Sequence, residues 1–197
     1  FGGQTPIRIA DKLKEFGYNI LGTSFEAIDI SEDRERFQKL IEKVGLKQPK
    51  SDISLGTKEL VSKSSKLNFP ILLRPSYVLG GRMMEKMNSM DDVQNYIDQN
   101  YWALENNIIL IDEFLKEAKE VDVDILRDVN GNTMIAGIME HIEEAGIHSG
   151  DSACCIPPFS LSEDIINSIK EFSISLSQEL ETIGLMNVQY AIKDDEI

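Results

Sequence analysis

Cysteine is nearly absent from this sequence: its 197 residues include two, Cys154 and Cys155, which are neighbours. Adjacent cysteines are a poor pair for ordinary disulfide geometry, so a disulfide framework is excluded. There is no CxxC spacing, and the two histidines, His141 and His148, do not combine with cysteine at zinc-site spacing. We therefore expect two reduced thiols, packed as small apolar side chains, in a cytoplasmic protein.

The sequence also lacks any apolar run near the ~20 residues that a bilayer-spanning helix needs. Its first residues, Phe1 to Gln4, contain neither the basic region nor the apolar core of a signal peptide. No membrane is expected as a partner. An initiator Met is absent as well, so we expect the chain to be a piece of a longer protein.

Basic residues are few, with 20 Lys and Arg against 34 Asp and Glu, which gives a net charge of −14. Because such a surface repels nucleic acids and anionic lipids, neither is an expected partner. An anionic ligand such as a nucleotide would need local help from a few Arg or Lys side chains, backbone N–H groups and a bound cation.

The periodicity of the sequence predicts five helices and seven strands. The expected helices cover residues 5–16, 31–44, 57–66, 89–99 and 162–183, with Ser31, Ser89 and Ser162 as caps. The expected strands cover residues 19–21, 71–73, 83–87, 108–112, 119–126, 133–141 and 186–192. Asn130-Gly131 marks a hairpin turn, and residues 47–56 read as a connector. The fold class is therefore α/β with α+β character, and its antiparallel hairpins exclude a doubly wound sheet. We expect a boundary at Asp112–Leu115.

Arg74 stands where a buried strand meets a loop that contains Gly80 and Gly81. Glycines let the backbone approach a ligand, and successive N–H groups beside an arginine can hold phosphate. The alternative is an ordinary hairpin with a surface arginine.

Several polar patterns are open to two interpretations. Glu120, Asp122 and Asp124 line one strand face, which is either a solvated face or a carboxylate site for a ribose hydroxyl or a cation. Gln189 points away from the apolar face of its strand, so it is either an edge residue or a ligand. His148 lies in a loop with two glycines and two hydroxyls, a structural loop or a binding loop. The sequence contains no Ser-His-Asp spacing, Walker A motif or GxGxxG.

Six segments resemble the large subunit of carbamoyl phosphate synthase, an ATP-grasp enzyme. They are FGGQTP at 1–6, EDRERF at 32–37, FPILLRPSYVLGGRMME at 69–85, EVDVDILRD at 120–128, IMEHIEEAGIHSGDSAC at 138–154 and MNVQYAI at 186–192. Their order and spacing agree over the whole chain. The sequences of these segments are similar to the second ATP-grasp half of the bacterial, glutamine-dependent type. That second half phosphorylates carbamate, whereas the first half activates bicarbonate.

The resemblance implies a domain plan and a set of partners. Residues 1–30 would end a pre-ATP-grasp domain, 31–111 would carry the lid, and 112–197 would begin the ATP-grasp core. The implied ligands and partners are ATP, Mg²⁺ or Mn²⁺, K⁺, carbamate, the first half of the same subunit and the glutaminase small subunit. The implied activity is a ligase of arginine and pyrimidine biosynthesis.

The resemblance also implies site residues. Arg74, Gly80 and Gly81 would contact the phosphates of ATP, Glu113 and Leu115 would form the hinge that binds adenine, and Glu120 would contact the ribose. The loop that closes on the nucleotide would contain Gly146, Ile147, His148 and Ser149. Magnesium would bind Gln189, and K⁺ would lie near Glu120 and His141. Arg74 is the implied catalytic residue.

Some positions depart from the family pattern. Glu113 stands where a His is common, and Glu144 replaces a Gln. The family's next strand, with further magnesium ligands, would follow Ile197, so we expect this chain alone to be inactive.

Two other functions stay open at this point. One is another ATP-grasp ligase, such as a biotin or purine-pathway carboxylase, against which GIHSGDSAC argues. The other is a non-catalytic ATP-binding module, in which Gln189 and Glu120 would be unneeded.

Overall fold

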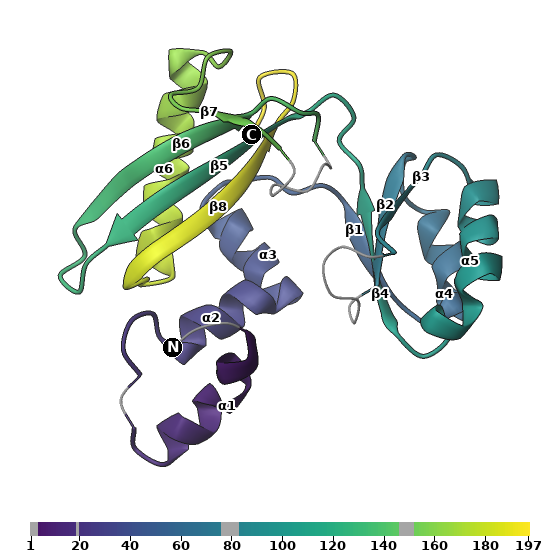
Figure 1. Ribbon diagram of the computed structural model, residues 1–197, viewed down its shortest axis with the longest axis horizontal. Coiled ribbons are helices and arrows are strands. Elements are labelled where there is room, and N and C mark those ends of the chain that lie inside the picture. The colour runs from purple at the N-terminus through teal and green to yellow at the C-terminus, as the bar shows by residue number, and fades with distance from the viewer. Residues whose placement is uncertain (1–3, 19, 76–82, 146–151) are drawn as a thin grey trace. The chain divides into compact units, whose positions relative to one another are not determined.

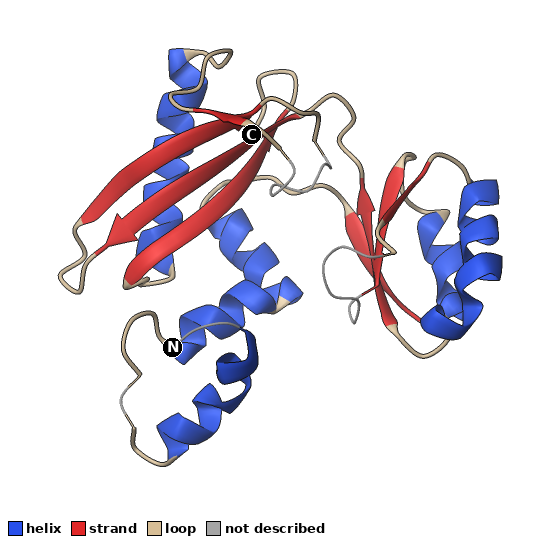
Figure 2. Cartoon of the chain, in the orientation of Figure 1, coloured by secondary structure: helices blue, strands red, loops and turns tan. Residues whose placement is uncertain are grey.

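The computed structural model describes residues 4–18, 20–75, 83–145 and 152–197. The chain forms two compact units (Figure 1). The first contains the described residues of Phe1–Gln48, Lys119–Glu144 and Asp151–Ile197, and the second those of Pro49–Ala118 and Ala145–Gly150. Helices and strands alternate irregularly in both, as Figure 2 shows.

The first unit is built on a sheet in the order β7-β6-β5-β8, antiparallel throughout. Its strands are β5 (Lys119–Arg127), β6 (Thr133–His141), β7 (Cys154–Cys155) and β8 (Gly184–Ile192). One face of this sheet is covered by α6 (Glu163–Glu179) (Figure 1). The other face is the one that we call the open face of the β5 sheet.

The core of the first unit follows the alternation of β5. Val121, Val123 and Ile125 are fully buried and pack against Ile169 and Leu176 of α6. Burying each such side chain stabilises the fold by roughly 1.5–3 kcal/mol relative to exposure. The intervening residues of β5 must then lie on the open face, because successive side chains of a strand point to opposite sides.

Three more helices belong to the first unit: α1 (Gln4–Glu15), α2 (Phe25–Glu32) and α3 (Arg34–Lys43). Ile41 of α3, with the following Leu46, packs into the core of the β5 sheet. By contrast, Ile9 and Leu13 of α1 and the following Phe16 are exposed.

The second unit is a sheet in the order β1-β4-β2-β3, again antiparallel. Its strands are β1 (Ser51–Leu55), β2 (Ile71–Pro75), β3 (Glu85–Met87) and β4 (Ile108–Glu113), and its helices are α4 (Thr57–Ser64) and α5 (Met90–Leu104). Leu60 of α4 and Val93 of α5 pack on the face that carries Ile71, Leu73 and Ile111.

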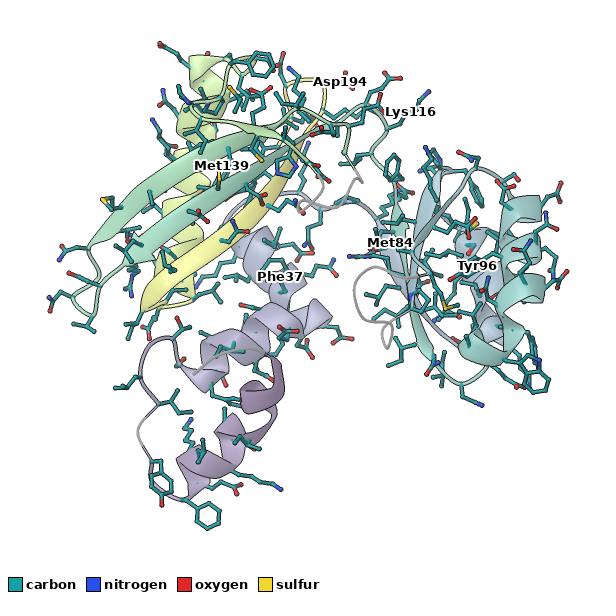
Figure 3. All side chains as sticks on the ribbon, viewed as in Figure 1. Phe37, Met84, Tyr96, Lys116, Met139 and Asp194 are labelled. Carbon is teal, nitrogen blue, oxygen red and sulfur yellow. The ribbon has the colours of Figure 1, made fainter. Side chains whose placement is uncertain are left out.

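Tyr96 of α5, labelled in Figure 3, lies in the core of the second unit. Its hydroxyl donates to the Met83 carbonyl at 2.7 Å. Burial, together with the charge of Glu85, raises the pKa of Tyr96 to about 12.

Most predicted elements are confirmed. The strand over 133–141 is found at those bounds, and Ser89 with Asp92 forms a capping box on α5. Ser162 caps α6, accepting from the Ile165 N–H at 3.3 Å.

Four local expectations are wrong. Ser31 does not cap a helix: it donates to the Ala27 carbonyl inside α2, and Asp33 caps α3 by accepting from the Arg36 N–H at 2.8 Å. The residues after Asn19 form no strand, and α6 ends at Glu179 rather than at Gly184.

The fourth error is β1, which was read as part of a connector. Its alternation is inverted: Ser54 is the buried residue, bonded to the Gly56 carbonyl at 2.7 Å, while Ile53 and Leu55 are exposed. A strand whose inward residue is polar gives no hydrophobic signal.

Candidate functional site

Arg74 lies on β2, on the face of the second unit's sheet that is opposite α4 and α5. The β2–β4 register sets Leu72 opposite Asp112 and Arg74 opposite Leu110, so Arg74 and Asp112 are diagonal neighbours. The Arg74 Nε and Nη2 donate to Asp112 Oδ2 at 2.9 and 2.5 Å. Asp112 is largely buried, whereas the Arg74 side chain is 45% exposed. The guanidinium is therefore fixed by a carboxylate and still reaches solvent. Gly80 and Gly81 lie outside the described residues.

The predicted hinge residues follow directly on β4. The Glu113 carboxylate accepts from the Asn68 backbone N–H at 2.8 Å and from its side-chain amide at 2.9 Å. The N–H groups of Glu113 and Phe114 donate to Lys50 and Pro70, and the Leu115 carbonyl accepts from Ala118 at 3.3 Å. The side chain of Glu113 and these main-chain groups are thus all occupied within their own unit.

A lysine also lies beside the hinge. The Lys86 ammonium sits 4.9 Å from the centre of the Phe114 ring, in cation–π range. Lys86 is opposite Leu72 in the sheet, so it shares the face of Arg74.

His141 is the centre of a polar cluster on the open face of the β5 sheet. Its side chain is 1% exposed, and its Nε2 lies 2.7 Å from Asp122 Oδ2. Its Nδ1 lies 3.6 Å from Glu120 Oε2 and has no hydrogen-bond partner within the described part of the chain. In the neutral tautomer whose Nε2–H donates to Asp122, Nδ1 carries the lone pair and faces the Glu120 carboxylate. In that tautomer two acceptors face each other, an arrangement that a cation or a donor such as a hydroxyl would satisfy.

Gln189 stands on β8 directly opposite Asp122, and its side chain is exposed. Two residues earlier on β8, the side-chain amide of Asn187 donates to Asp124 at 2.9 Å. Met139, labelled in Figure 3, is opposite Asp122 on the other neighbouring strand. The sheet therefore places Glu120, His141 and Gln189, which are far apart in sequence, on one face of adjacent strands.

Glu140 was not foreseen as an important residue. It is buried on the α6 side of β6, where it accepts from the backbone N–H groups of Phe159 and Ser160 at 2.9 and 3.0 Å and from the Ser160 hydroxyl. Lys119 donates to the same hydroxyl at 2.6 Å. The sequence did contain a signal for this role, since the alternation of the strand places the Glu140 carboxylate on the inward side. A carboxylate that is buried there must be hydrogen-bonded.

The remaining predicted residues give a partial picture. Gly146, Ile147, His148 and Ser149 lie outside the described residues. Cys154 and Cys155 are free thiols, but Cys154 is exposed and Cys155 is half-buried, so the expected packing as small apolar side chains is wrong for Cys154. In the described part of the chain, no three His, Cys, Asp or Glu side chains converge as metal ligands. None of the described helices is long and apolar enough to cross a membrane.

Solved structures with the same architecture define the fold. The ADP complex of N5-carboxyaminoimidazole ribonucleotide synthetase matches with a TM-score of 0.78 at 20% identity, over 96% of this chain and 48% of that one. The biotin carboxylase domain of Hydrogenobacter thermophilus 2-oxoglutarate carboxylase, solved with MgADP and bicarbonate, matches at 0.70 and 15%, over 97% and 43%. D-alanine–D-alanine ligase of Bacillus anthracis, complexed with ATP, matches at 0.68 and 16%, over 95% and 59%. These likenesses establish the ATP-grasp fold.

Sequence comparison then gives the family. The family described as carbamoyl-phosphate synthase L chain, ATP binding domain, matches residues 33–197. The carbamoyl phosphate synthase large chains of Myxococcus xanthus and Archaeoglobus fulgidus are each 49% identical over all 197 residues. The chain belongs to the carbamoyl phosphate synthase large chain family. It spans 18% of the length of these relatives.

Proposed function

We propose that this chain is the ATP-binding part of the carbamate-phosphorylating half of a carbamoyl phosphate synthase. The match at 49% identity over the whole chain to large chains of that name supports the family. The choice of the carbamate half follows from the resemblance of FGGQTP, RPSYVLGGR and EHIEEAGIHSGDSAC to that half. The reaction would transfer the γ-phosphoryl group of ATP to a carbamate oxygen. Catalysis of such a transfer is mainly positioning and neutralisation of charge, so it needs no protein nucleophile.

Arg74 would bind the phosphates. A guanidinium offers several N–H donors in a fixed plane, and the two that contact Asp112 hold that plane in place. In a chain of net charge −14, such a fixed cation is what allows an anion to bind locally. The glycines 80 and 81 and the loop 146–149 would supply further contacts to the nucleotide.

Glu120 would accept from the ribose hydroxyls, and the main chain at Glu113 and Leu115 would contact the adenine. Gln189 would be a ligand of Mg²⁺ or Mn²⁺. The oxygen donors on the open face fit a hard cation, and Mg²⁺ commonly takes one or two protein ligands beside phosphate and water, so a three-residue cluster is not required. When bound, the metal would neutralise phosphate charge.

The Glu120 carboxylate beside buried His141 supplies the oxygen ligand that a monovalent cation such as K⁺ would need. Glu120 and His141 would hold that ion, which would be a permanent positive charge at the base of the site.

The domain plan stays a proposal: a pre-ATP-grasp tail over 1–30, a lid region over 31–111 and a core over 112–197. The compact units divide at 48/49 and 118/119, which lie 18 and seven residues after the proposed boundaries at 30/31 and 111/112. The proposed partners are carbamate, the bicarbonate-activating half of the same subunit and a glutaminase small subunit, in the cytoplasm. Because the chain spans 18% of its relatives, we propose that it does not turn over substrate alone.

A carboxylase of biotin or purine metabolism is the main alternative. The neighbours of that kind are 20% identical or less, which supports a common fold and nothing finer. The discriminating experiment is ATP formation from ADP and carbamoyl phosphate by the longer polypeptide that contains this chain. We expect it to occur; a polypeptide that makes no ATP from carbamoyl phosphate would contradict the proposal.

A non-catalytic ATP-binding module is the second alternative. Calorimetry of ATP binding with and without Mg²⁺ separates the two, because a catalytic site binds the magnesium complex. Equal binding in the presence of EDTA would favour the module.

A further inference from the structure

Trp102, near the end of α5, is the largest side chain in the molecule and is 91% exposed. It is also the single tryptophan of the sequence. Its ring meets that of Tyr101 edge to face, with the ring centres 6.0 Å apart and the planes at 84°. Exposed aromatic pairs of this kind are typical of contact surfaces, since Trp and Tyr dominate the energetics of protein interfaces.

The pair belongs to a continuous stripe. Tyr101 and Trp102 lie three and four residues after Asp98, and four and three residues before Glu105, so the four residues share one side of the helix. All four are exposed, whereas Val93, Ile97 and Leu104 on the neighbouring side of α5 are buried. We call these four residues the α5 stripe.

The α5 stripe is strongly negative. The helix has Asp91, Asp92 and Asp98 but no basic residue. The neighbours that orient the stripe's carboxylates are neutral: Gln94 donates to Asp98 at 2.9 Å, and the Tyr101 hydroxyl donates to Glu105 at 2.7 Å. No ion pair among the described residues involves either carboxylate. The helix C-terminus adds partial negative charge at the same end.

The backbone beneath the stripe is fixed. The Gly56 N–H donates to the Asn107 carbonyl at 2.9 Å, and the Asn107 side chain donates to the Ala103 carbonyl at 2.5 Å. A Cβ at Gly56 would lie 2.2 Å from the Glu105 carbonyl oxygen, and the φ of Gly56 is +72°. Glycine is therefore required at this position for the chain to pass so close to Glu105. The stripe is therefore presented on a rigid support, which lowers the entropic cost of binding.

We propose that the α5 stripe binds an arginine-bearing segment of another polypeptide. Arginine is favoured over lysine because its planar guanidinium both stacks on an indole face and pairs with a carboxylate. Asp98 and Glu105 are seven residues apart, about 10 Å along a helix. Two arginines three residues apart in a polyproline II segment, which makes one turn every three residues, point to the same side and span about the same distance, ~9 Å.

A second copy of this chain does not fit as the occupant. Its net charge of −14 would oppose association, and no two arginines of this sequence are three residues apart. The interaction is independent of the phosphoryl-transfer site, since none of the four residues has a part in the proposed reaction.

The single tryptophan gives a direct test. The chain is titrated with the peptide acetyl-Ala-Arg-Ala-Ala-Arg-Ala-amide while Trp102 emission is followed. We expect a saturable change of emission and, for the peptide with lysine in place of both arginines, an affinity lower by about fivefold or more. Absence of saturation, or equal affinity for the two peptides, would overturn the proposal.

Paired variants locate the contact. The Asp98→Asn, Glu105→Gln double variant should lose about fivefold or more in affinity for the arginine peptide. The Glu163→Gln, Glu171→Gln double variant, which removes the same charge from α6, should keep the wild-type affinity. Equal loss in both would mean that only net charge matters and would refute the stripe. Concentration-dependent self-association that buries Trp102 without peptide would also refute it.

Discussion

At the scale of single residues, the site depends on side chains held by partners in their own unit. Asp112 fixes Arg74, and Asp122 fixes His141, in each case through a hydrogen bond to a carboxylate on the sheet face that the core helices do not cover. Such bonds orient a group before its ligand arrives, which is how a protein reduces the reorganisation that a reaction requires. A predicted site residue can therefore depend on a neighbour that the sequence does not reveal.

Replacing Arg74 tests this at the phosphates. In the longer polypeptide, Arg74→Ala should lower kcat/KM of the carbamate-dependent reaction by about 100-fold, because a charge-assisted contact to the transferred group is lost. Arg74→Lys keeps the charge without the planar fork, so the loss should be smaller, about tenfold. Steady-state kinetics with ATP as the varied substrate measures both; wild-type values for both variants would place Arg74 away from the phosphates.

At the scale of secondary structure, helix caps decide where elements begin. Asp33 accepts from the Arg36 N–H, whereas Ser31 bonds a carbonyl within α2. We expect Asp33→Ala to destabilise the first unit by about 1 kcal/mol, the usual cost of losing an N-cap. Ser31→Ala is the matched control and should change stability by less than half of that. Urea unfolding followed by circular dichroism compares the two; similar losses would show that Asp33 is not the effective cap.

Tyr190 links β8 to α6 and gives the first unit a pH dependence. Its hydroxyl lies 2.9 Å from the Ser173 hydroxyl, and burial raises the pKa of Tyr190 to about 12, against a small opposite effect of Ser173. A raised pKa means that the folded state keeps its proton longer than the unfolded state. The stabilisation is therefore complete below pH 10 and is lost between pH 10 and 12.

The size of that loss can be measured. Between pH 9 and 11, the wild-type free energy of unfolding should fall by about 1 kcal/mol more than that of Tyr190→Phe. Tyr18→Phe, which removes an exposed phenol of the same unit, is the control for phenol ionisation in general. An identical pH dependence for the wild type and Tyr190→Phe would contradict the account.

The sequence predicted the elements with a clear period and missed those without one. β5 and β6 were foreseen because Val121, Val123 and Ile125 alternate with acids, and the same alternation placed Gln189 away from the core. β1 was missed because its inward residue is Ser54. The bonds of His141 to Asp122 and of Arg74 to Asp112 depend on strand register, which no local pattern contains.

At the scale of the whole molecule, a strongly acidic chain is proposed to bind an anion. Its 34 acidic and 20 basic residues give a repulsive surface, so binding must come from the few groups that face the ligand. Family membership identifies that ligand as ATP by analogy with the large chains. The assignment to the carbamate half, rather than to the bicarbonate half, is the part of the account that most needs a direct measurement.

That measurement is made on the longer polypeptide with Gln189→Ala, in two assays. One follows ATP formation from ADP and carbamoyl phosphate, and the other follows bicarbonate-dependent ATP hydrolysis. The account predicts that the first activity falls by about 100-fold, because a metal ligand is lost, while the second is kept. Gln178→Ala, an exposed amide on α6, should keep both. Loss of the bicarbonate-dependent activity with ATP formation intact would contradict the central claim.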